Sequence, residues 1–182
     1  MSVVAFLPRA SPLGFLLKGH LTIKKLIEDA LNLAQVYGAE YADIRVDDLK
    51  HEFIEVENGK LENLYNSDSI GFGVRILLNG CWGFSASSII TGAEVEKVVK
   101  QAFNIAKASA IVKKENIVLS DSSPIRAKYT SSFEIDPFKV PLSDKLNLLM
   151  NISEKASKYK EITVSKSELN FFKHLKREIF HY

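Results

Sequence analysis

Two Asn-Gly pairs, Asn58-Gly59 and Asn79-Gly80, constrain the fold of this 182-residue chain more than any other feature. Each pair lies between runs in which apolar and polar residues alternate, such as Ser69–Leu78 before the second pair. Both residues of an Asn-Gly pair tolerate the positive φ angles of a two-residue turn, so each pair predicts a β-hairpin. We therefore expect an antiparallel meander of about five short strands.

The first strand of this meander shows which side of the sheet is buried. Alternation over 42–47 gives a buried side and a polar side, the latter carrying Asp43, Arg45 and Asp47. Later in the chain, 126–135 predicts a further strand, and 162–180 alternates weakly and predicts one or two more.

Helical periodicity precedes and follows the meander. The first helix is predicted from a Thr22 cap to Gly38, and the second begins at the capping box Thr91-Gly-Ala-Glu94. A third is predicted with Ser143 as its cap and an apolar side formed by Leu142, Leu146, Leu149, Ile152, Ala156 and Tyr159. The order of elements predicts an α+β fold, a mostly antiparallel sheet with two or three long helices packed on it.

Charge and composition exclude several classes of function. The formal net charge is only +2 and the one basic run is Lys173–Arg177, so nucleic-acid binding is not expected. No apolar stretch is long enough to span a bilayer, so no membrane partner is expected either. A single cysteine, Cys81, makes a disulfide framework impossible and fits a cytoplasmic location. Residues 1–20 are expected to form a poorly ordered extension.

Three local patterns suggest chemistry but fail on spacing. Gly71-x-Gly73 lacks the third glycine of a dinucleotide loop, so its glycines are expected where a strand is bulged, bent or closely approached by another backbone. His51-Glu52 lacks a second histidine one helical turn later, which a zinc site of that type requires. Cys81 has no base placed near it by the sequence and is expected to be a small buried residue beside a turn.

Several segments in a fixed order resemble a known family. They are "GAEYADIRVDD", "EVENGKLENL", "GFGVRILLNGCWGFSAS", the pair Asp136-Pro137 and "PLSDKLNLL". Together they resemble the N-terminal domain of the TldD/PmbA family of metallopeptidases, once called modulators of DNA gyrase. The likeness extends from Leu21 to Ser165 and so covers most of the chain.

The resemblance implies proteolysis of extended peptides within a dimer of two-domain subunits. It also implies a metal, zinc, held in the C-terminal domain by a His-Glu-x-x-x-His motif and a cysteine. This chain has no such motif. We therefore expect 21–182 to be the N-terminal domain of a shortened or split protein without the catalytic C-terminal domain, and assign no catalytic, cofactor-binding or metal-binding residue to it.

The function expected from the resemblance is non-catalytic. The domain would contribute to dimer assembly and to the enclosure of extended peptide, with no hydrolysis on its own. Its candidate peptide or interface surface is Arg75, Asn79, Trp82 and Phe84. The expected partners are a C-terminal half or TldD/PmbA-type subunit, an extended peptide, and a second copy in a homodimer. The alternative is a non-enzymatic assembly or regulatory domain that pairs with a full-length relative.

Overall fold

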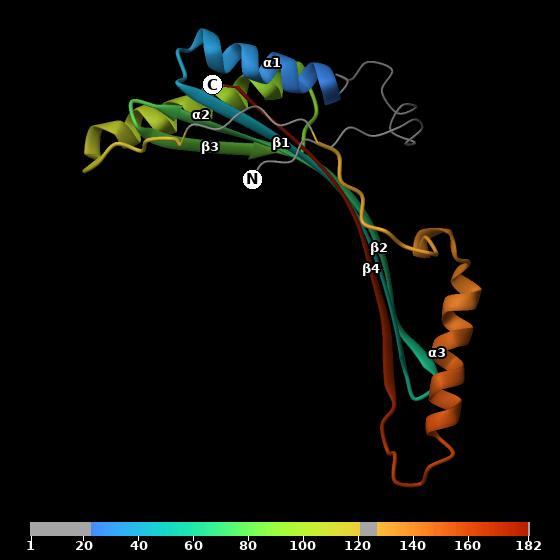
Figure 1. Ribbon diagram of the computed structural model, residues 1–182. Helices are drawn as coiled ribbons and strands as arrows, with labels where there is room; N and C mark the ends of the chain where they lie inside the picture. Colours follow the sequence, from blue (N-terminus) through green and yellow to red (C-terminus); the bar gives the residue numbers. More distant parts are fainter. Residues whose placement is uncertain (1–22, 121–126, 182) are drawn as a thin grey trace. The chain divides into compact units, whose positions relative to one another are not determined.

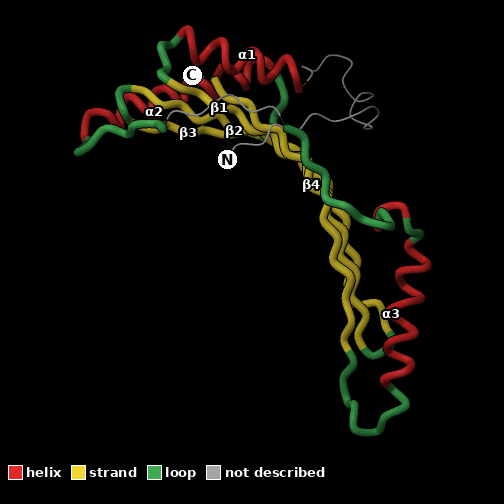
Figure 2. The backbone as a smooth tube through the Cα atoms, viewed as in Figure 1, coloured by secondary structure: helices red, strands yellow, loops and turns green. Residues whose placement is uncertain are grey.

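The computed structural model describes residues 23–120 and 127–181 of the chain. Its elements are α1 (Ile23–Val36), β1 (Tyr41–Glu57), β2 (Lys60–Leu78), β3 (Cys81–Ser87), α2 (Gly92–Val112), a short 3₁₀ helix (Pro137–Lys139), α3 (Leu142–Ala156) and β4 (Lys166–His181). Within the described chain the strands form an antiparallel sheet in the order β3-β2-β1-β4, accompanied by the three α-helices (Figures 1 and 2). The predicted α+β class is confirmed. The expected extension, residues 1–20, and the Thr22 cap lie outside the described residues.

Both predicted hairpins are present. Asn58 and Gly59 have φ angles of 48° and 73°, and Asn79 and Gly80 have 49° and 67°. Across the second turn Leu78 pairs with Cys81 in the antiparallel ladder between β2 and β3. The positive φ angles that the Asn-Gly pairs tolerate are therefore the ones that the chain adopts at both turns.

The number of strands in the meander was predicted wrongly. β1 has 17 residues and β2 has 19, and each is continuous where the sequence pattern suggested two strands. Polar residues such as those at 66–69 interrupt the alternation, but the ladder is formed by backbone groups and continues through them. Similarly, β4 is a single strand, and residues 127–135 form no strand.

Two of the predicted helix signals are confirmed. Gly38 has a φ of 84°, and its N–H donates to the carbonyl of Gln35 just after α1 ends. The hydroxyl of Thr91 accepts a hydrogen bond from the N–H of Glu94 at 3.3 Å, as an N-cap does.

The chain divides into two compact units. The two-helix unit contains the described residues of Met1–Asp48, Ile70–Tyr129 and Lys176–Tyr182, and with them α1, α2 and β3. The one-helix unit is formed by Leu49–Ser69 and Thr130–Leu175 and contains α3. Strands β1, β2 and β4 each contribute residues to both units.

In the two-helix unit, α1 and α2 contact each other and cover one face of the sheet (Figure 1). Glycine is required at position 83 because α2 lies very close to β3 there. A Cβ atom on Gly83 would lie 1.9 Å from the carbonyl oxygen of Ala102 and 2.5 Å from the backbone nitrogen of Ala106. The core between helices and sheet consists of Leu26, Ile27, Ala30, Ala34, Ala42, Ile44, Val46, Phe72, Val74, Ile76, Val95, Val98, Val99 and Ala102.

In the one-helix unit, α3 lies alongside the strands (Figure 2). The face that it packs on them is partly polar. Leu149 packs on Ile54 and Val56 in a small apolar core. Beside it the ammonium of Lys145, which is only 5% exposed, forms an ion pair with the carboxylate of Glu52.

This packing differs from the predicted third helix. Lys145 and Ser153 are buried on α3, whereas Leu142 and Ile152 are 38% and 44% exposed. The hydroxyl of Ser153 accepts a hydrogen bond from the N–H of Gly59 at 2.9 Å, and Lys145 is bound to Glu52, so specific polar partners turn these two positions towards the sheet. The predicted Ser143 cap is also wrong, because α3 begins at Leu142 after Pro141 without a side-chain cap.

We predict that Gly83→Ala destabilises the protein by about 3 kcal/mol or more, because α2 must move away from β3 to admit the methyl group. Gly73→Ala is the matched control. A Cβ there would lie 2.9 Å from the ring of Phe84, which is 57% exposed and can turn aside, and at an ordinary contact distance of 3.7 Å from the Cβ of Ala86. A loss below about 1 kcal/mol is therefore expected. Urea unfolding measures the loss of stability in both variants. Equal losses would contradict the inference that α2 packs against β3 at Gly83 too closely to admit a Cβ atom.

We also predict that Lys145→Ala costs about 3 kcal/mol, because it leaves the largely buried carboxylate of Glu52 without its counter-charge. The double variant Lys145→Met/Glu52→Leu removes both charges and is expected to lie within about 1 kcal/mol of the original protein or above it. Lys158→Ala, in an exposed pair with Glu154, should change stability by less than about 0.5 kcal/mol. Thermal unfolding of the three variants tests this order.

Candidate functional site

The candidate site lies on the face of the two-helix unit's sheet that α1 and α2 leave uncovered. Ala42, Ile44 and Val74 point into the core under the helices, so their neighbours along each strand point to the other face. That face carries Asp43 of β1 and Arg75 of β2, which are joined by an ion pair. Two large aromatic side chains of β3, Trp82 and Phe84, complete it.

A buried carboxylate holds Arg75 in place. Asp43 is 1% exposed, and its Oδ2 accepts hydrogen bonds from Nε of Arg75 at 2.7 Å and lies 2.6 Å from Nη2. A second guanidinium, that of Arg45, contacts the other oxygen of Asp43 at 3.3 Å and pairs with Glu178 at 2.7 Å. Two cations thus compensate a carboxylate that would be costly to bury alone.

Arg75 also stacks on the tryptophan. Its Cζ lies 4.5 Å from the centre of the Trp82 ring, and Trp82 makes an edge-on contact with Tyr41 at 5.6 Å. Burial opposes the charge of the guanidinium, but the hydrogen bond and charge of Asp43 outweigh it and raise the pKa of Arg75. Arg75 is therefore a fixed cation with one planar face against an aromatic ring.

Phe84 lies next to this cluster and is largely open to solvent. It is opposite Arg75 in the β2–β3 ladder, and 57% of its surface is exposed. Gly73 leaves room for its ring, because a Cβ at that position would lie 2.9 Å from a ring carbon of Phe84. The expected close approach of another backbone is not what Gly73 accommodates: the nearest atoms belong to the side chain of Phe84.

Asn79 occupies the turn between β2 and β3. Its N–H donates to Oε1 of Glu40 at 2.8 Å, and its carbonyl accepts from Nζ of Lys113 at 2.5 Å. The structure thus brings together three of the four candidate residues, Arg75, Trp82 and Phe84. Asn79 lies in the turn, where its N–H and its carbonyl group are both hydrogen-bonded.

The sequence did not reveal the group on which this cluster depends. Alternation put Asp43 on the polar side of its strand, but the structure buries it and surrounds it with two arginines. The available signal was the spacing of Asp43 and Arg45, which lie two residues apart and hence on one face of one strand. Arg75, already a candidate surface residue, lies on a neighbouring strand. Strand pairing alone could not show that Arg75 would reach the same carboxylate.

The edge of the sheet beside the cluster is formed by β3. In the sheet of described strands, β3 pairs with β2 on one side and with no strand on the other. Trp82 and Phe84 are therefore close to a row of backbone N–H and C=O groups that can accept a further strand.

The other candidate groups do not form a catalytic or metal site. His51 lies in the one-helix unit, stacked on Phe172 with ring centres 4.2 Å apart and with Nε2 2.8 Å from Oδ1 of Asn170. Cys81 is buried beside the second turn, as expected. No cluster of three or more His, Cys, Asp or Glu side chains suited to a metal ion occurs in the described parts of the chain. None of the described helices has the length and apolar character to cross a bilayer.

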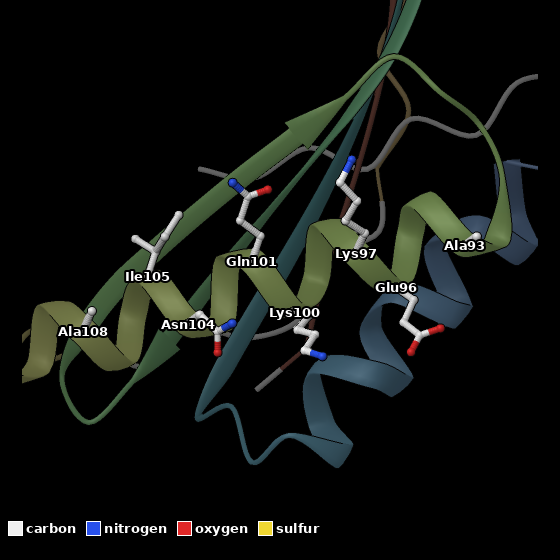
Figure 3. Close-up of a pocket in the computed structure, with 8 residues that line it drawn as sticks. All are labelled: Ala93, Glu96, Lys97, Lys100, Gln101, Asn104, Ile105 and Ala108. Carbon is white, nitrogen blue, oxygen red and sulfur yellow. The ribbon is translucent and has the colours of Figure 1, made fainter.

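A shallow groove follows the outer surface of α2 in the two-helix unit (Figure 3). Its lining comes from α2 alone, with Ala93 and Ala108 at its ends and Lys100 and Asn104 between them. Gln101 accepts a hydrogen bond from Ser85 at 3.0 Å. The groove lacks convergent polar groups around an enclosed volume, so it does not resemble a small-molecule site.

We predict that Arg75→Lys destabilises the protein by about 2 kcal/mol, because a lysine cannot reproduce the planar contact with Asp43 and Trp82. The change should also shift the fluorescence of Trp82, the only tryptophan. Arg45→Lys is the matched control: Arg45 contacts Asp43, whereas the ring of Trp82 packs on Arg75 and Tyr41, so the emission of Trp82 should stay unchanged. An unaltered spectrum in Arg75→Lys would contradict the stacking.

Comparisons with known proteins agree with this fold. Residues 42–106 match the sequence model of the family described as PmbA/TldA metallopeptidase domain 1. A metalloprotease of Methanocaldococcus jannaschii is 30% identical over 132 residues, which cover 71% of this chain and 29% of that protein. A metalloprotease of Methanothermobacter thermautotrophicus is 26% identical over 118 residues, or 65% of this chain and 25% of that protein. The chain thus matches less than a third of the length of these relatives.

Solved structures show the same fold at low sequence identity. A protein of Bacteroides thetaiotaomicron described as a modulator of DNA gyrase has a TM-score of 0.69 and 18% identity, covering 86% of this chain and 36% of its own. TldE of Thermococcus kodakarensis has a TM-score of 0.60 and 14% identity, with the same coverage. The sequence match and the shared fold agree, and this chain carries the first, N-terminal domain of the TldD/PmbA metallopeptidase family.

Proposed function

We propose that this domain is a non-catalytic part of a TldD/PmbA-type metallopeptidase that assembles subunits and encloses extended peptide substrates. Its assembly partner would be a second copy or another TldD/PmbA-type subunit, in the cytoplasm. The observation that carries the proposal is the open edge of β3, beside which Trp82 and the exposed Phe84 lie.

The family's metal is proposed to bind elsewhere. The described residues do not fit it, since they offer no set of three or more His, Cys, Asp or Glu side chains placed around a common point. We therefore assign no step of hydrolysis to these residues. Their proposed contribution is to bind and orient the peptide.

Strand addition at β3 would suit a peptide of any sequence. Backbone N–H and C=O groups along the edge would supply the hydrogen bonds, and these do not depend on the peptide's side chains. Phe84 would give apolar contact, and the cation of Arg75 would remain fixed by Asp43 rather than free to select acidic residues. The expected substrate class is therefore unfolded or extended chain with little sequence preference.

Fluorescence anisotropy with a labelled unstructured peptide tests this proposal. We expect Phe84→Ala and Trp82→Ala to weaken binding about tenfold, because each removes apolar contact beside the edge. Ile105→Ala on α2 is the control, since Ile105 is partly exposed on the helix-covered side of the sheet and should leave affinity unchanged.

A second pair of peptides distinguishes strand addition from non-specific apolar binding. A scrambled peptide is expected to bind equally well, whereas a peptide N-methylated at alternate residues should lose binding because it can no longer donate to the edge. Equal affinity for the methylated peptide would refute the proposed mode of binding.

A further inference from the structure

A hollow with a volume of about 500 Å³ lies in the one-helix unit. Three segments far apart in the sequence border it: the turn at Asn58-Gly59, the C-terminal half of α3, and residues 162–165, which lead into β4. Its volume falls in the range of small-molecule sites. Unlike the groove on α2, this hollow is bordered by groups from separate segments that face a common space.

Hydrogen bonds between these segments fix the shape of the hollow. The N–H of Asn58 donates to the carbonyl of Ser165 at 2.8 Å, and Oδ1 of Asn58 accepts from the N–H of Ser165 at 2.9 Å. The N–H of Gly59 donates to Oγ of Ser153 on α3 at 2.9 Å. The turn is therefore tied both to the segment before β4 and to α3.

Uncharged polar groups line the hollow. Because Oδ1 of Asn58 is bound to Ser165, Nδ2 keeps two N–H donors that bond to none of the described residues. The amide of Asn151 and the hydroxyl of Thr163 belong to exposed residues, and each can donate and accept. The hollow therefore offers both donors and acceptors to a ligand.

The distribution of charge disfavours an ionic ligand. Glu154 is the one ionisable side chain among the described residues that line the hollow, and its carboxylate lies 3.7 Å from Nζ of Lys158. An anion would find no cationic partner in this lining, and it would lie near the negative end of the α3 dipole. A cation would have to compete with Lys158 for a single carboxylate. A neutral ligand avoids both costs.

We propose that this hollow binds a neutral, hydroxyl-rich small molecule of the size of a monosaccharide. Asn58, Asn151 and Thr163 bond its hydroxyl groups, because these uncharged groups match the mixed donors and acceptors that neighbouring hydroxyls present. Met150 and Ile162 contact the C–H groups on the face of its ring. This binding is separate from the peptide binding proposed at β3, which belongs to the two-helix unit.

NMR titration of the isotope-labelled chain tests the proposal. Glucose, N-acetylglucosamine and myo-inositol are the neutral probes, and inorganic phosphate and tetramethylammonium are the ionic ones. At least one neutral probe is expected to shift the amide signals of Gly59, Thr163 and Ser165 saturably. The expected Kd is on the order of 1 mM, because so small a ligand makes few contacts. The ionic probes are expected to leave these signals in place.

Three variants remove the proposed ligand contacts one at a time. Thr163→Val and Asn151→Leu replace polar groups by apolar ones of similar size at exposed positions, so both chains should fold. Asn58→Asp keeps the oxygen that accepts from Ser165 and removes both N–H donors. Each variant is expected to weaken binding of the neutral probe about fivefold to tenfold, which is the value of one hydrogen bond.

The same exchanges outside the hollow are the matched controls. Thr130→Val and Asn104→Leu alter exposed residues that do not line it, and both should leave the affinity unchanged. The inference is overturned if none of the three neutral probes gives a saturable shift, or if phosphate or tetramethylammonium shifts the same signals equally. Unchanged affinity in all three variants of the hollow would also overturn it.

Discussion

The close approach of α2 to β3 at Gly83 determines how the two-helix unit is built. With no side chain at this position, backbone atoms of Ala102 and Ala106 come directly against the strand. The valines of α2 can then fill the core against the central strands, and the residues of β3 that point away from the helix remain on the open face. The close packing of α2 on β3 thus depends on the absence of a Cβ atom at Gly83.

Much of this fold could be predicted because its turns and helix caps are specified by a few neighbouring residues. Both predicted turns and the predicted N-cap are present, at Asn58-Gly59, Asn79-Gly80 and Thr91. The continuity of β1 and β2 could not be predicted, since backbone pairing tolerates polar residues that periodicity treats as breaks. The buried face of α3 was missed because Lys145 is buried through one distant carboxylate.

For the candidate site, the sequence predicted which residues belong to it but not the contacts that hold them together. Arg75, Trp82 and Phe84 could be chosen from their place around the second hairpin, and the structure brings them together. What holds them, the burial of Asp43 between two guanidinium groups, depends on contacts between strands far apart in sequence. Single-sequence patterns contain no record of such contacts, so the partner of an arginine is harder to predict than its position.

The late position of β4 in the chain has a consequence for the order of folding. Hairpins β1–β2 and β2–β3 close over two-residue turns, whereas His51 of β1 and Asn170 of β4 meet across 119 residues. Loop closure therefore costs more entropy for β4, although this cost grows only with the logarithm of the loop length, and contacts of this range form slowly. Until β4 docks, β1 has an unpaired border of its own, with backbone N–H and C=O groups that β4 later satisfies.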